Sequence, residues 1–438
     1  MKKFITTIQH IFAIEELRNR IINTLGFLLI FRLGSFVVLP GIDPSLLPDE
    51  ASGVFGLLDT FLGGAFSRVA IFGLGIMPYI SASIVIQLLT VATPYFQKLQ
   101  KEGESGRKKI NQITRVLTIL ICLAQSFGYL AGTIDDAAII IDRTLFTGLS
   151  MIILTSGTIF CMWLGEKITD KGIGNGISML IMIGIISRFP VAIIAEWLSR
   201  GGIQGALLFI IELLALFVIV MGVVALTQAI RRVPVQYAKQ VVGNKVYGGQ
   251  RQYIPLKLNA SGVMPIIFAQ ALMFLPGLLV QYFGDKSDFI QNVGTQFLDY
   301  GSFVYSATLA VLIIVFTFFY TAITVNPQQI ADDLKRNGGF IPGIKPGKMT
   351  QEFIDNILTK ITLPGSIFLA IVAIFPGLAM KLGVESNFAQ FYGGTSLLIM
   401  VGVILDTLQQ IESYLLMRHY EGLMKSGKIK GRSQVAVA

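Results

Sequence analysis

The stretch that decides the fold is GVFGLLDTFLGGAFSRVAIFGLGIMPYISASIVIQLLTVAT, residues 53–93. It is apolar over more than one membrane span, because about 20 helical residues already cross the ~30 Å hydrocarbon core. Residues that disfavour a helix interior interrupt it, namely Gly63, Gly64, Gly73, Gly75 and Pro78. The pattern predicts a short helix at about residues 54–66 and a membrane span at about residues 75–92.

Two interpretations fit the short first helix. It is too short to cross a bilayer, so it either enters the membrane and returns or lies on the surface as an amphipathic linker. Backbone that enters without crossing is tolerated only where protein or water surrounds it. The first interpretation therefore implies a cavity inside a helical bundle, with this helix in its mouth.

The composition is that of a polytopic helical membrane protein. Of the 438 residues, 53% are hydrophobic and 14% are charged, whereas soluble domains carry roughly 25% charged residues. Cys122 and Cys161 fall in apolar runs and are expected to be buried thiols. His10 and His419 are the only histidines, so the sequence predicts no histidine-based metal site, no catalytic centre and no cofactor.

Ten apolar segments are long enough to be membrane spans. They lie at about residues 21–39, 75–93, 115–133, 145–164, 175–194, 205–229, 262–282, 304–324, 363–380 and 392–414. An even number places both termini on one side. That side carries 28 of the 35 Lys and Arg residues, and the opposite loops carry five. Because positive residues stay on the cytoplasmic side, we expect both termini, including the tail at 416–438, to be cytoplasmic.

Two cytoplasmic loops are much longer than a reversal of direction requires. Residues 231–261 alternate apolar and polar side chains around VGNKVYGGQ, which predicts a projecting β-hairpin. Residues 326–362 contain a predicted helix at 327–336, a turn at GGFIPGIKPG and a second helix at about 350–360. Long basic loops of this kind favour partner docking over passive connection.

The chain divides near Gly201 into two sets of five spans, residues 1–200 and 201–415. An odd number of spans in each half inverts the second half relative to the first, and inverted repeats place a transport pathway between the halves. A secondary transporter built on inverted repeats is therefore an alternative. The spans contain few charges to hold a coupling ion, which argues against it. Arg32 and Arg188 lie near span ends, where they can snorkel to the interface, and Glu212 lies inside its span without an evident role.

Several spans begin at glycine-rich motifs that carry isoleucines, such as GLGIMPYISASI and KGIGNGISMLI. Isoleucine is stiff and apolar, so a ring of these side chains would form a constriction that excludes water and ions and yet could be pushed apart. Enzyme signatures are weak. GNGIS is not a nucleophile elbow, KEGESGRKK is not a phosphate loop, and an intramembrane hydrolase lacks a histidine within a span, so we expect no enzyme.

The chain resembles the SecY/Sec61 alpha family of protein translocase channels over nearly its whole length. The motifs that carry the resemblance are FRLGSFVVLPGID (31–43), GIMPYISASI (75–84), KEGESGRKKI (101–110), WLGEKITDKGIGNGIS (163–178), IPLKLN (254–259), FFYTAITVNP (318–327), PGIKPG (342–347) and YGGTSLLI (392–399).

The resemblance implies an all-α membrane protein whose ten transmembrane helices form two inverted five-helix halves around a central pore. It implies a protein-conducting channel that translocates unfolded secretory chains and releases hydrophobic segments laterally into the bilayer. A short re-entrant plug helix at about residues 54–68 would close the pore and would include Val54, Leu57, Leu58, Phe61, Phe66 and Arg68. The pore ring would consist of Ile76, Ile80, Ile177, Ile181, Ile267 and Ile399.

The resemblance also assigns a lateral gate and a docking surface. The gate would include Ser81, Gln87, Thr114 and Asn259. The long loops would bind the SecA motor ATPase or the translating ribosome through Lys245, Arg251 and Lys345. Where the family turn often reads PGIRPG, this chain has Lys345, which keeps the charge and loses the planar fork of arginine. The remaining implied partners are small SecE-like and SecG-like membrane subunits, signal peptides and nascent chains. The implied location is the plasma (inner) membrane of a bacterium.

Overall fold

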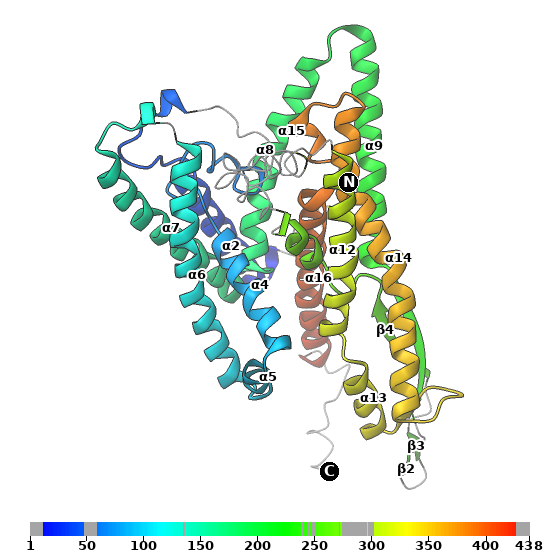
Figure 1. Ribbon diagram of the computed structural model, residues 1–438. Helices are drawn as coiled ribbons and strands as arrows, with labels where there is room; N and C mark the ends of the chain where they lie inside the picture. The colour runs from blue at the N-terminus through cyan, green and yellow to red at the C-terminus, as the bar shows by residue number, and fades with distance from the viewer. Residues whose placement is uncertain are drawn as a thin grey trace. The chain divides into compact units, whose positions relative to one another are not determined.

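The computed structural model describes residues 12–47, 59–134, 136–237, 240–242, 245–247, 251–270, 272–273, 296 and 302–425. The described chain is mostly helical (Figure 1). It groups into two compact units, one with residues 1–51, 58–188 and 402–438 and one with residues 52–57 and 189–401. Two boundaries between these units, after residues 188 and 401, fall inside helices. The predicted halves, residues 1–200 and 201–415, are instead each continuous in sequence. The division into these halves therefore remains a prediction.

The first unit is a bundle of long helices. The helix α6 (Glu104–Thr133) packs against α4 (Met77–Ala92), α5 (Pro94–Lys101) and α7 (Arg143–Lys171). The helix α2 (Glu15–Gly34) packs on α7. Two short 3-10 turns, η1 (Pro44–Leu46) and η2 (Asp136–Ala138), lie against each other, and the unit also holds the first part of α8 (Gly176–Ser199) and the last part of α16 (Gly394–Lys425).

The second unit combines helices with a small sheet. It holds α9 (Gly202–Gln228), a helical stretch at residues 264–270, α12 (Phe303–Thr324), α13 (Pro327–Arg336), α14 (Lys348–Lys381) and α15 (Ser386–Ala389). The helix α12 packs along α14, and α13 and α15 also contact α14. Since α14 touches three other helices, it is the main packing partner within this unit.

Seven helices of the described residues are long and apolar enough to cross a membrane, namely α6, α7, α8, α9, α12, α14 and α16. The pair α4 and α5 makes an eighth if it counts as one span, and it is bent by 96° at its break. Two of the ten predicted spans are missing from this set. The charged residues at the start of α2 lower its hydropathy, and most of the predicted span at 262–282 lies outside the described residues.

The predicted hairpin is confirmed. The strand β1 (Ile230–Tyr237) pairs antiparallel with β4 (Arg251–Lys257), and β2 (Gln240–Val242) pairs with β3 (Lys245–Tyr247) nearer the tip. The sequence did not predict that β5 (Gly339–Phe340), from the other long loop, also pairs with β1. The two loops therefore form one three-stranded sheet in the order β4-β1-β5.

Two predicted helices differ from the structure. The short helix expected at residues 54–66 continues only to Phe61 among the described residues, and turns follow. Gly63 and Gly64 have φ of 62° and 87°, a left-handed conformation that cannot continue a right-handed helix. The loop helix at 350–360 and the span at 363–380 are one helix, α14, which runs through Pro364 and Pro376. Neighbouring helices can satisfy the backbone groups that such prolines free in a membrane bundle.

The expectation for the cysteines is confirmed. Cys122 and Cys161 are both buried and unbridged. The Cys122 thiol donates to the Thr158 hydroxyl over 3.4 Å, which links α6 to α7. Among the described residues, no three or more His, Cys, Asp or Glu side chains gather in a way that could hold a metal ion.

Candidate functional site

Four of the six predicted ring isoleucines lie in the first unit, in two pairs. Ile76 caps the start of α4 and Ile80 lies one turn further, while Ile177 and Ile181 occupy the first turns of α8. Side chains four residues apart share one face of a helix. Ile76 is buried and the other three are partly buried. Each of the two helices therefore presents a pair of isoleucines on one face.

The segment 59–68 packs on both of these helices. Gly184 lies three residues after Ile181 and so continues the same face of α8. A Cβ atom at Gly184 would lie 2.0 Å from the carbonyl oxygen of Phe61, so only glycine permits this approach of the two backbones. At Gly75, beside Ile76, a Cβ atom would lie 2.3 Å from Cδ2 of Leu62. Residues 59–67 are all buried, so the segment is enclosed beside the isoleucine pairs.

Polar contacts hold the middle of the segment 59–68. The carbonyl oxygen of Gly63 accepts hydrogen bonds from Nη1 of Arg32 at 2.7 Å and from Nη2 of Arg68 at 2.8 Å. The Asp59 carboxylate forms an ion pair with Arg188 and accepts from the Ser67 amide at 2.9 Å. Arg32 and Arg188 thus both bind this segment, a role that the sequence analysis did not predict.

The end of the segment is anchored to α6. The Tyr129 hydroxyl donates to the carbonyl oxygen of Phe66 over 2.6 Å, and the two rings lie 4.5 Å apart. Of the predicted plug residues, Phe61, Phe66 and Arg68 therefore belong to this packed segment. Val54, Leu57 and Leu58 lie outside the described residues.

The other two predicted ring residues, Ile267 and Ile399, lie in the second unit. Ile267 is in the helical stretch 264–270, and Ile399 is in the second turn of α16. The Thr395 hydroxyl donates to Oε1 of Gln270 over 3.1 Å. Because each isoleucine is about one turn from a residue of this bond, both lie near the point where the two helices are joined.

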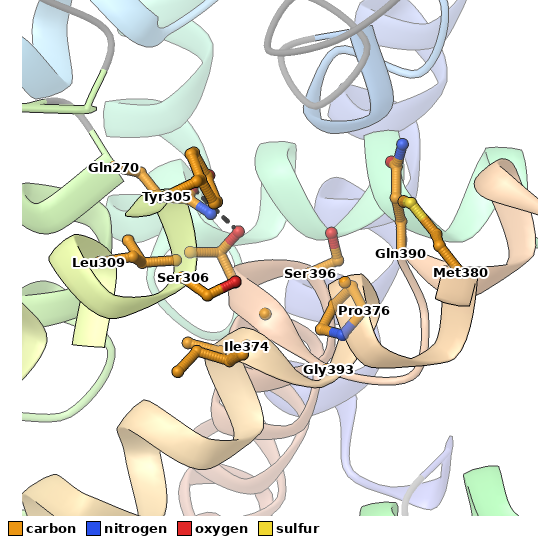
Figure 2. Close-up of a pocket in the computed structure, with 14 residues that line it drawn as sticks. Gln270, Tyr305, Ser306, Leu309, Ile374, Pro376, Met380, Gln390, Gly393 and Ser396 are labelled. Atoms are coloured by element: carbon orange, nitrogen blue, oxygen red, sulfur yellow. Dashed lines mark hydrogen bonds between the residues drawn. The ribbon is translucent and has the colours of Figure 1, made fainter. Parts of the chain in front are cut away.

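A pocket adjoins this joint in the second unit (Figure 2). Side chains from α12, α14 and the start of α16 line it, with Gln270 at one side and Gln390 at the other. Residue 271 and most of residues 274–301, which continue the chain beyond Gln270, lie outside the described residues. The pocket therefore lies where α12, α14 and the start of α16 come together.

Three of the four predicted gate residues lie on two helices that pack together. Ser81 and Gln87 are on α4 and Thr114 is on α6. The Ser81 and Thr114 hydroxyls donate to carbonyl oxygens four residues earlier in their own helices, at 3.1 and 2.9 Å. Asn259, in the second unit, is buried and accepts from the Ser261 hydroxyl at 3.2 Å. These bonds are local, so the gate assignment stays a prediction.

The predicted docking residues lie on or beside the three-stranded sheet. Lys245 is in β3 and Arg251 begins β4, and the structure describes the backbone but not the side chain of each. Lys345 is exposed in the turn before α14, where its carbonyl oxygen accepts from the Thr350 hydroxyl at 3.0 Å. A hydrophobic core fixes the sheet on α13 and α14, formed by Val233, Val235, Leu256, Leu334, Ile341, Ile354 and Leu358. The three-stranded sheet, which includes Arg251, is therefore a folded element and not a loose loop.

Val235→Asp should unfold this sheet locally. Val235 is 1% exposed, and an unpaired charge at such a position costs about 3 kcal/mol or more. We expect faster amide hydrogen exchange in β1 and β4, with the membrane helices unaffected. Gln252→Asp is the control, because Gln252 is the exposed cross-strand partner of Val235. Equal exchange in the two variants would show that the core does not hold the sheet.

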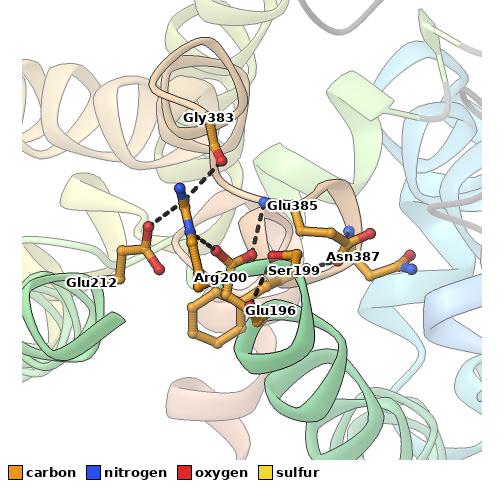
Figure 3. A network of polar contacts seen from close by, with 8 residues as sticks. Glu196, Ser199, Arg200, Glu212, Gly383, Glu385 and Asn387 are labelled. Atoms are coloured by element: carbon orange, nitrogen blue, oxygen red, sulfur yellow. Dashed lines mark hydrogen bonds and ion pairs between the residues drawn. The ribbon is translucent and has the colours of Figure 1, made fainter. Parts of the chain in front are cut away.

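A polar network explains Glu212 (Figure 3). Arg200 follows α8 and binds three acceptors, namely the Glu196 and Glu212 carboxylates and the carbonyl oxygen of Gly383. Glu196 also accepts from the Glu385 amide at 2.8 Å. The network therefore ties the α8–α9 turn to the segment between α14 and α15.

The sequence analysis identified the charges at Arg188 and Glu212 within the spans but missed their partners. Asp59 and Arg188 are 129 positions apart, so no local pattern connects them. Arg200 and Glu212 are 12 apart, on either side of a Gly-Gly turn that brings two helices together. A pair of opposite charges flanking a helical hairpin is the one signal that could have identified the second pair.

The sequence comparisons agree on one family. The SecY family model matches residues 70–408. Protein translocase subunit SecY of Streptomyces scabiei is 42% identical over 96% of this chain and 100% of the relative. That of Vibrio cholerae serotype O1 is 41% identical over 96% of each chain.

The structure comparisons show the same fold at low sequence identity. A structure of a protein-conducting channel is 16% identical with a TM-score of 0.63, and a SecY structure on how the plug domain stabilises the closed state of the translocation channel is 17% identical with a TM-score of 0.60. Sec61 in the canine ribosome-channel complex is 15% identical with a TM-score of 0.59. Each comparison covers 90% of this chain and 92% of the other.

Proposed function

Because the chain belongs to the SecY family, we propose that it is a protein-conducting channel that passes unfolded secretory chains across the membrane and releases apolar segments sideways into the bilayer. The ten predicted spans are consistent with the fold of this family. The secondary transporter is not supported, because the relatives are translocase subunits. SecY is a channel subunit, so the energy for transport comes from a partner.

The observation that carries the proposal for this chain is the position of the segment 59–68. It packs on α4 and α8 beside the isoleucine pairs at positions 76, 80, 177 and 181. A buried segment at such a point can close an apolar constriction. We therefore assign it as the plug, and we assign the ring to these four isoleucines together with Ile267 and Ile399.

The partners follow from the same proposal. A multi-pass translocase subunit with a folded, basic cytoplasmic sheet suits a ribosome, which Sec61 binds in the canine complex, or a SecA motor ATPase. Lys245, Arg251 and Lys345 are the assigned contacts on this surface. Small SecE-like and SecG-like subunits complete the assembly in a bacterial plasma membrane. Both termini face the cytoplasm, as the distribution of Lys and Arg predicts.

Site-specific photocrosslinking during arrested export tests the proposal. A photoreactive residue is placed in turn at Ile80, Ile177, Ile267 and Ile399, with a stalled secretory chain as the target. We expect adducts at all four positions, because a chain in transit must pass the ring. Ile210, which is 58% exposed on α9, is the lipid-facing control. Adducts confined to the cytoplasmic loops would mean that the protein receives substrates without conducting them.

A further inference from the structure

The contacts of the segment 59–68 indicate what holds this segment in its closed position. We propose that Arg188 is a positioning residue that latches this segment through its ion pair with Asp59, and that release of the pair is a step of channel opening. The opening step rests on the proposed function. The latch itself rests on contacts within the first unit.

The face of α8 that carries the ring isoleucines also contacts the segment 59–68, through Gly184 and Arg188. We call this contact surface the seat of the segment. Ile177, Ile181, Gly184 and Arg188 follow one another at spacings of four, three and four, which keeps them on one side of the helix. Arg188 lies seven residues beyond Ile181, or roughly 10 Å along the axis at 1.5 Å per residue. Gly184 lets the backbone of Phe61 approach, and Arg188 then reaches the Asp59 carboxylate.

The arginine side chains around the segment leave no room for a side chain at Gly63 or Gly64. A Cβ atom at Gly63 would lie 2.6 Å from Nη1 of Arg32, and one at Gly64 would lie 2.8 Å from Nη2 of Arg188. Both glycines also have positive φ angles, so a side chain there would be strained in addition to clashing. The guanidinium groups therefore occupy the space that the two glycines leave open.

The Asp59 carboxylate offsets positive charge around the segment 59–68. Three guanidinium groups gather there: those of Arg32 and Arg68 donate to the Gly63 carbonyl oxygen, and that of Arg188 forms the ion pair with Asp59. The Asp59 side chain is 6% exposed and that of Arg188 is 25% exposed, so water screens the pair only in part. Loss of the carboxylate would leave three like charges close together, and their repulsion would favour release of the segment.

The alternative role for these contacts is structural, in which they only stabilise the fold of the unit. A latch makes a different prediction, because its loss changes the position of the segment and the permeability of the channel while the helices stay folded. The test therefore measures the position of the segment, the permeability of the channel and the folding of the helices separately. Ser67→Cys reports on the segment, since Ser67 is 4% exposed and its amide donates to Asp59. Its chemical labelling should be slow while the latch is closed.

The experiment compares Asp59→Asn, Arg188→Gln and the double variant in the assembled translocase, reconstituted in lipid vesicles. Asparagine keeps an oxygen that can accept from the Ser67 amide, so this variant removes the charge with little change of shape. We measure maleimide labelling of Ser67→Cys and ion conductance in planar bilayers. The background is the same protein without Ser67→Cys, because Cys122 and Cys161 are buried. Thermal unfolding of each variant shows whether it is folded.

We expect each single variant to raise the labelling rate and the conductance roughly tenfold, a factor that corresponds to about 1.4 kcal/mol. The double variant should not exceed the larger single effect, because both changes remove one contact and the loss of Arg188 also relieves the repulsion that Asp59→Asn creates. Arg188→Lys should restore most of the closed behaviour, since it keeps the charge. Glu16→Gln is the control, because it removes a carboxylate from an exposed pair with Arg20 at the start of α2.

The outcomes separate the latch from the proposed function. Unchanged labelling in folded Asp59→Asn would overturn the latch, whatever the conductance. Faster labelling with wild-type conductance would show that the segment is released without opening a pore, which overturns the opening step and the plug assignment. Additive effects in the double variant would mean that the two residues act separately. If no photocrosslinks formed at the ring positions, the proposed channel function would be wrong. The labelling result would still show whether the ion pair of Asp59 and Arg188 holds the segment.

Discussion

Ile80→Ser combined with Ile267→Ser should give a channel that leaks ions at rest. Each change removes three carbons and adds a hydroxyl group, and a buried CH₂ contributes about 0.8 kcal/mol of transfer free energy. Water would therefore wet the constriction far more easily, and a wetted constriction conducts ions. We expect a rise in resting conductance in planar bilayers of at least roughly tenfold, which corresponds to about 1.4 kcal/mol.

The leak must be specific to the ring positions. Ile210→Ser is the matched control, because it makes the same change on a side chain of α9 that is 58% exposed. The single variants Ile80→Ser and Ile267→Ser should each leak less than the double variant. Wild-type conductance in the double variant would count against a ring that includes both residues, and equal leaks in the double variant and the control would indicate general disruption.

Arg200→Ala should be the most destabilising single substitution in the polar network. Glu196 is fully buried and the Glu212 side chain is 11% exposed, so removal of Arg200 leaves two carboxylates without their counter-charge. Breaking a buried ion pair in this way costs about 3–5 kcal/mol. We expect a clear fall in the unfolding temperature of the purified protein in detergent.

Matched variants test this explanation. Lys381→Ala removes an exposed positive charge at the end of α14 and should leave the unfolding temperature nearly unchanged. Glu212→Gln should be far milder than Arg200→Ala, because Oε2 of Glu212 is buried without a hydrogen-bond partner. Arg200→Lys should not restore full stability, since an ammonium group cannot reproduce the planar fork that serves several acceptors. Equal stability of Arg200→Ala and Lys381→Ala would show that the network is not structural.

Local pattern predicted most elements well. The span expected at residues 304–324 is the helix at Phe303–Thr324, and the loop helix at 327–336 has the same bounds in the structure. The hairpin at 231–261 was visible because its alternation and Gly-rich tip are local signals. Prediction failed at α14, where the helix expected at about 350–360 and the span expected at 363–380 are one continuous helix that packs against α12 and α13.

The sequence by itself determined that this is a multi-pass helical membrane protein with two long loops on one side, because hydropathy and the Lys and Arg bias depend only on the order of residues. Its motifs also indicated the family. Only the tertiary structure decided what the buried charges do. Asp59 meets Arg188 across 129 positions, and Arg200 meets the Gly383 carbonyl across 183. Such contacts form because helix packing brings distant residues together, and in an apolar interior each charge requires a partner that only this packing selects.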